Sequence, residues 1–71
     1  MNTVQSTGRL RRFVRYIEID FEYPQTDITN IINEAIANEE DRGAWLLDVK
    51  IGKPSDKSLM IVTLLFEKEV L

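Results

Sequence analysis

Four arginines near the beginning of this sequence have a spacing that could bind phosphate or another anion. Arg9, Arg11, Arg12 and Arg15 occupy four of seven consecutive positions, with apolar residues between them. Guanidinium groups neutralise phosphates and pair with carboxylates, so this segment is a candidate contact for an anionic partner. The alternative is a basic flank that balances acidic groups of the same chain, and the net charge of −3 favours it. Because Arg15 falls on the apolar face of its segment, we expect it to pair with a carboxylate or to lie beyond the end of a helix.

An acidic triplet follows directly. Glu18, Asp20 and Glu22 alternate with apolar residues and would share one face of an extended strand. Such a row could offer oxygen ligands to a hard cation, but calcium needs more ligands, arriving from several directions. We therefore interpret the triplet as a solvated strand face that discourages edge pairing, and we predict no metal site.

The composition removes most catalytic chemistry. The sequence contains neither histidine nor cysteine, so Ser-His and Cys-His nucleophiles, disulfides and thiolate zinc sites have no residues to form them. The remaining lysines and carboxylates show no catalytic spacing. We predict a protein that is not an enzyme and that has no cofactor.

Length and hydropathy predict one small domain. The 71 residues are 44% hydrophobic, yet no apolar run is long enough for a membrane helix, so we expect no membrane partner. The polar residues 1–10 are predicted to form a disordered leader, and residues 11–71 a single domain. No export signal is apparent, which favours the cytoplasm. With disulfides and metals excluded, oligomerisation is the remaining support for so small a fold.

Hydrophobic periodicity predicts the order β-α-β-β. The first strand, at about 11–23, alternates apolar and charged residues, and Pro24 would end it. A helix is expected at about 27–41, capped by Thr26 or Asp27 and stopped by a left-handed Gly43. Its apolar stripe recurs at helical period and consists of Ile28, Ile31, Ile32, Ala35 and Ile36.

Two further strands complete an α+β fold. They are expected at about 44–51 and 58–68, joined by a turn at 52–57. The last strand is apolar on both faces and therefore belongs in the middle of the sheet. A right-handed crossover through the helix then gives a three-stranded sheet of order 1-3-2 with the helix on one face.

A single helix leaves the other face of this sheet uncovered, and this predicts self-association. Simple alternation places Trp45, Leu47, Val49 and Ile51 under the helix. The uncovered set, assigned to an oligomer interface, is Val14, Tyr16, Leu46, Met60, Val62, Leu64 and Phe66. Alternation alone leaves open which half of the last strand meets the helix.

The helix end and the strand after it resemble a family of small bacterial and phage-encoded β-α-β-β proteins of unknown function. The matching residues are Asn33-Glu34, Ala37-Asn38, the segment 42–49 (RGAWLLDV) and Phe66-Glu67-Lys68. The family pattern has Gly followed directly by Trp, and Ala44 departs from it. The resemblance implies the same fold and no catalytic residues.

Three functions are compatible with these features. The first is a non-enzymatic homo-oligomer that binds another protein, such as a regulator or inhibitor encoded by a bacterium or a phage. The second is a homo-oligomer that binds a small aromatic or nucleotide ligand on Trp45 and Tyr16. The third is a nucleic-acid-binding module that uses the arginines of residues 9–15.

Overall fold

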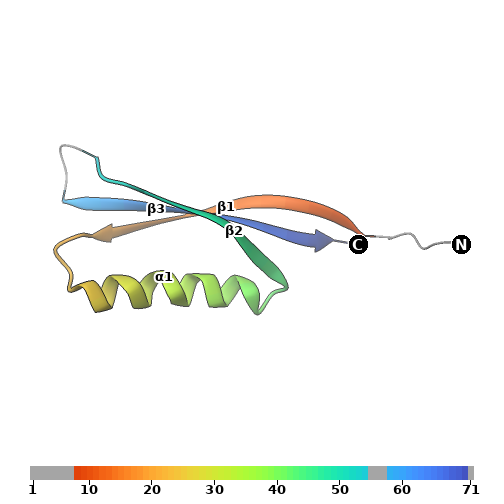
Figure 1. Cartoon of the computed structure of the whole chain (residues 1–71), viewed down its shortest axis with the longest axis horizontal. Coiled ribbons are helices and arrows are strands. Elements are labelled where there is room, and N and C mark those ends of the chain that lie inside the picture. The colour runs from red at the N-terminus through yellow and green to blue at the C-terminus, as the bar shows by residue number, and fades with distance from the viewer. Residues whose placement is uncertain (1–7, 55–57, 71) are drawn as a thin grey trace, which may run out of the picture.

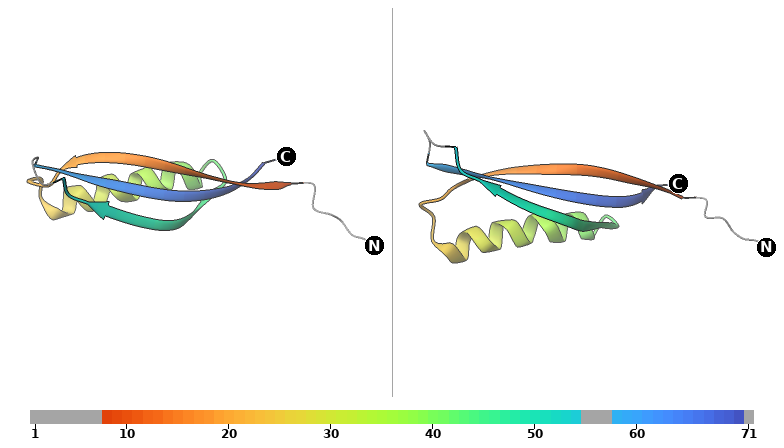
Figure 2. Two further views of the ribbon diagram at one scale, coloured as in Figure 1. Left: turned by 90° about the horizontal axis from the view of Figure 1, so that it is seen from above. Right: turned by 45° about the horizontal axis from the view of Figure 1, so that its top comes forward.

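The computed structural model describes residues 8–54 and 58–70 and has the predicted order of elements. The elements are β1 (Arg9–Asp20), α1 (Gln25–Glu40), β2 (Ala44–Gly52) and β3 (Leu59–Val70). β3 pairs antiparallel with both neighbours, and the sheet order is β1-β3-β2. The helix lies along one face of the sheet (Figures 1 and 2). The predicted α+β fold with a 1-3-2 sheet is confirmed.

β1 is displaced towards the N-terminus relative to the prediction. It begins at Arg9, so the last two positions of the predicted leader belong to the strand, while residues 1–7 lie outside the described residues. It ends at Asp20 rather than at Tyr23. The Asp20 carboxylate accepts the Glu22 N–H at 2.9 Å, and its carbonyl accepts the Tyr23 N–H at 3.1 Å. Aspartate favours such a turn because its side chain bonds the backbone two residues on.

The helix begins without the predicted side-chain cap. Pro24 precedes its first residue, and its carbonyl accepts the N–H groups of Asp27 and Ile28 at 3.0 and 3.1 Å. Thr26 and Asp27 lie inside the first turn, so their assignment as caps is wrong. The Asp27 carboxylate still interacts favourably with the positive end of the helix dipole there.

β3 supplies the centre of the core. Val62, Leu64 and Phe66 are completely buried, and Met60 nearly so, on the face that α1 covers. Phe66 pairs with Phe13 of β1, and their rings stack with centroids 5.4 Å apart. The assignment of these four β3 residues to an uncovered interface is therefore wrong: they are the half of β3 that meets the helix. The other half is only partly buried.

A β-bulge in β2 reverses the predicted faces of its first residues. Pairing with β3 runs regularly to Leu46, skips Leu47 and resumes at Asp48. Because one extra residue changes the alternation, Leu46 pairs with Phe66 on the helix side and Trp45 lies on the opposite face. Both positions had been predicted the other way round, since simple alternation cannot anticipate a bulge.

The helix is shorter than the sheet that it covers. Its 16 residues span about 24 Å, whereas the 12 residues of β1 or β3 span about 40 Å. The start of β1 and the end of β3 therefore extend past α1 as a two-stranded ribbon (Figure 1).

The turn between α1 and β2 depends on Gly43, which has the predicted left-handed conformation with φ +90°. A Cβ at this position would contact nothing within 4 Å, so the cost of Gly43→Ala comes from the backbone alone. We expect this variant to lower the free energy of unfolding by about 1 kcal/mol in denaturant titration. Gly52→Ala is the matched control, because Gly52 also has open space around it but no positive φ. An equal loss in both variants would contradict this explanation.

Candidate interaction surface

The sheet face opposite α1, called the open face here, has no covering element among the described residues. Register with β3 places Val14 and Tyr16 of β1 on it, as predicted, beside Leu65 and Thr63. Tyr16 is 67% exposed. Of the predicted interface set, these two residues alone lie on this face.

A polar bridge crosses all three strands at one end of the open face. The Glu67 carboxylate of β3 accepts from Arg12 Nε of β1 at 3.2 Å and from Trp45 Nε1 of β2 at 3.1 Å. Trp45 is thus held by its indole N–H on the open face and not in the core. These bonds fix the ring and tie both edge strands to the central one.

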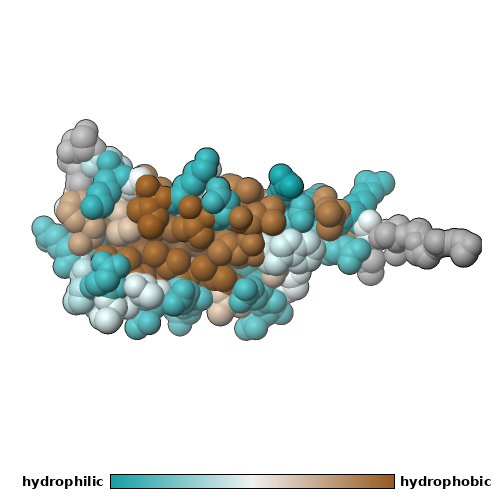
Figure 3. Space-filling model, in the orientation of Figure 1, coloured by the Kyte–Doolittle hydropathy of each residue, from teal (hydrophilic) through white to brown (hydrophobic). Residues whose placement is uncertain are grey.

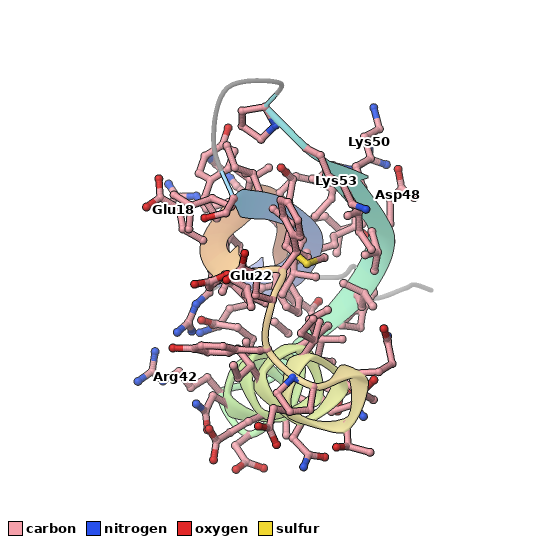
Figure 4. All side chains as sticks on the ribbon, turned by 90° about the vertical axis from the view of Figure 1, so that its left-hand side faces the viewer. Glu18, Glu22, Arg42, Asp48, Lys50 and Lys53 are labelled. Carbon is pink, nitrogen blue, oxygen red and sulfur yellow. The ribbon has the colours of Figure 1, made fainter. Side chains whose placement is uncertain are left out.

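A shallow hollow occupies the middle of the open face. It is lined by Val14, Asp48, Lys50, Thr63 and Leu65. Figure 4 shows Asp48 and Lys50 projecting outward from β2, away from the helix. A charged pair beside apolar groups in an open depression suits contact with a protein surface better than enclosure of a small molecule.

Four large apolar side chains are exposed along β2, which is an edge strand. We call Trp45, Leu47, Val49 and Ile51 the β2 apolar set; their exposed fractions are 40, 41, 39 and 55%. Figure 3 shows apolar surface gathered where β2 passes in front of the sheet and above α1. A monomeric protein rarely exposes an apolar edge strand of this kind, because its free backbone groups can pair with another chain.

The four arginines are not brought together as a single anion site. Arg12 bonds Glu67 on the open face, and Arg15 Nη1 bonds Glu39 Oε2 of α1 at 2.8 Å on the helix side. The expectation that Arg15 pairs with a carboxylate is confirmed. Arg9 and Arg11 form no ion pair with any of the described residues. Two of the four guanidinium groups are therefore neutralised internally.

Glu39 was not singled out by the sequence, although a signal existed. It continues the apolar stripe four residues after Ala35, so it is buried between the helix and the sheet. A carboxylate on the apolar face of the helix, together with Arg15 on the apolar face of a strand, could have indicated a pair. Arg42 Nη1 lies farther from the same carboxylate, at 3.9 Å.

The acidic triplet is not assembled into a ligand cluster. Glu18 and Asp20 are in β1, but Glu22 lies in the turn that follows. In the part of the chain that the structure describes, no three carboxylates are placed to hold a metal ion, and no helix has the length and apolar character to cross a membrane.

No family model, curated protein or solved structure matches the chain. The resemblance to small bacterial and phage-encoded proteins therefore stays a prediction.

The Arg15–Glu39 pair should stabilise the fold more than the Arg12–Glu67 pair. The two side chains of the first pair are 39% and 11% exposed, whereas the Arg12 side chain is 66% exposed. We expect Arg15→Met to lower the free energy of unfolding by about 2 kcal/mol, because Glu39 then stays buried with only the longer contact to Arg42, at 3.9 Å. Arg12→Met, the matched control, should cost less than about 1 kcal/mol.

The double variant Arg15→Met/Glu39→Met should regain most of the loss, since apolar groups can replace a buried ion pair. Equal melting temperatures for Arg15→Met and Arg12→Met would show that the partly buried Arg15–Glu39 pair contributes no more than the Arg12–Glu67 pair.

Proposed function

We propose that this chain is a non-enzymatic interaction protein that acts as a homo-oligomer and binds another protein in the cytoplasm. The observation that carries the proposal is the β2 apolar set, which is about 40–55% exposed on a strand without an outer neighbour. A second chain that covers this strand would bury apolar side chains and satisfy free backbone groups together.

The open face supplies a second surface, for a different protein. It combines the exposed rings of Tyr16 and Trp45 with the charged groups of Arg12, Asp48 and Lys50. Aromatic residues and arginine are enriched in protein interfaces, where a fixed ring contacts a large area at low entropic cost. A regulator or inhibitor of a partner protein, encoded by a bacterium or a phage, is the role that suits such a chain.

The two other functions receive less support from the geometry. Tyr16 and Trp45 do not line the hollow on the open face, so they do not form a ring-binding site with it. Arg12 and Arg15 are engaged with Glu67 and Glu39, which halves the basic segment that a nucleic acid could use.

The test is the mass of the purified chain in sedimentation. We expect a multiple of 8.3 kDa at micromolar concentration. Ile51→Lys should shift the mass towards the monomer, because it places a charge in the β2 apolar set that the second chain would desolvate. Leu10→Lys is the control, since Leu10 is 63% exposed but lies in β1.

A wild-type mass near 8.3 kDa over a wide concentration range would overturn the homo-oligomer. Dissociation by Leu10→Lys and not by Ile51→Lys would move the interface away from β2.

A further inference from the structure

The outer part of β2 has a symmetric sequence. From residue 47 to residue 51 it reads Leu-Asp-Val-Lys-Ile, which is apolar, acidic, apolar, basic, apolar. Reversing the order about Val49 exchanges the aspartate with the lysine and one aliphatic residue with another. A strand with this pattern is complementary to a reversed copy of itself.

We propose that two copies of this chain join through their β2 edges, antiparallel, with the two-fold axis at Val49. The inference rests on the proposed self-association and specifies its geometry. Each Asp48 then lies opposite Lys50 of the second copy, and each Leu47 opposite Ile51 of the second copy. Opposite residues in an antiparallel pair lie about 4.5–5.5 Å apart, which is within reach of an ion pair.

The two charged residues lie on the same face of the sheet, as this pairing requires. Asp48 pairs with Leu65 and Lys50 with Thr63, and all four line the hollow on the open face. In the single copy the Asp48 carboxylate accepts the Val49 N–H at 2.9 Å, so pairing at Val49 has to transfer this N–H to a carbonyl of the second copy. An ionised carboxylate has further acceptor positions, so it can also accept from the lysine of the second copy.

Neighbouring registers are excluded by charge. A two-fold axis at residue 48 would oppose two aspartates, and an axis at residue 50 would oppose two lysines. An axis between residues 49 and 50 would oppose Asp48 to Ile51, mixing charged and apolar side chains on one face. The register about Val49 alone matches both charge and hydropathy along residues 47–51.

The other edge strand is less suited to self-pairing. β1 has arginine at four of its first seven positions, and two antiparallel copies of that half would bring like charges together. Charged side chains are a common means of protecting an edge strand. In β2 the two charges instead complement each other.

The pairing also explains the exposure of two side chains on the helix side. Val49 and Ile51 pair with the buried Leu64 and Val62, yet they are 39 and 55% exposed because α1 does not extend over them. The assembled dimer has a continuous six-stranded sheet with both helices on one face. Val49 of each copy then meets Val49 of the second copy between the helices, and Ile51 meets Leu47 of the second copy.

Disulfide trapping tests the register, and the chain has no native cysteine to interfere. In the proposed dimer, Val49→Cys places two thiols at the axis, within the Cα separation of about 4.4–6.8 Å that a disulfide accepts. Leu47→Cys and Ile51→Cys are matched single variants from the same edge. Each lies about 13 Å from its own copy across the axis, which is too far to bridge. We expect rapid covalent dimers from Val49→Cys, none from either control, and covalent dimers again from the double variant Leu47→Cys/Ile51→Cys.

A charge reversal tests the ion pairs in the cysteine-free chain. Lys50→Glu should raise the dissociation constant by about tenfold or more at low salt, because two attractive pairs become repulsive. The double variant Asp48→Lys/Lys50→Asp restores opposite charges and should recover wild-type association. The difference between these variants should shrink at high salt, since the pairs are exposed.

The outcomes separate this inference from the proposed function. An oligomer in which Leu47→Cys or Ile51→Cys crosslinks as fast as Val49→Cys, or in which none of the three crosslinks, overturns the register and leaves self-association standing. The register is also overturned if the double variant Asp48→Lys/Lys50→Asp does not recover wild-type association. A wild-type chain that stays monomeric overturns both.

Discussion

A helix about 24 Å long has to cover a sheet whose longer strands run about 40 Å, and most of the structure follows from that mismatch. The helix places its apolar stripe over the middle strand, where Val62, Leu64 and Phe66 become fully buried. It covers the start of β2, where Ala44 is buried, but not the outer half of β2 around Val49 and Ile51 or the far ends of β1 and β3. β2 carries four exposed large apolar side chains, and it is the strand with the fewest charges to protect its edge.

The position of the helix over the sheet depends on a polar contact as well as on burial. Arg15 lies between apolar residues of β1, and its bond to Glu39 joins the middle of that strand to the last turn of α1. An apolar stripe alone allows a helix to slide along a sheet, whereas a partly buried ion pair favours one arrangement. Gly43 then reverses the chain within a few residues, so β2 starts beside the end of the helix (Figure 1). The ion pair between β1 and α1 and the turn at Gly43 together determine where the uncovered edge lies.

The element order, the sheet order and the helical stripe could be predicted because they depend on period and on chain connectivity. The faces of the strands could be predicted only in part. Val14 and Tyr16 were placed correctly, but the bulge at Leu47 moved Leu46 and Trp45 to opposite faces. No residue type in β2 marks that bulge. The face of β3 that meets the helix could not be predicted, for a different reason. Both faces of this strand are apolar, so periodicity could not show whether the half with Val62 or the half with Ile61 lies under the helix. That choice is made by the register with β1, in which Phe13 meets Phe66.

The central claim is that β2 is an unfinished edge that a second copy of the chain completes. Amide hydrogen exchange at low and high protein concentration tests it directly, because an edge N–H that gains a strand partner exchanges more slowly. The claim predicts that protection in β2, around Val49, rises with protein concentration, while protection in β1 does not change. Protection that is independent of concentration throughout the sheet, or that rises in β1 instead, would contradict it.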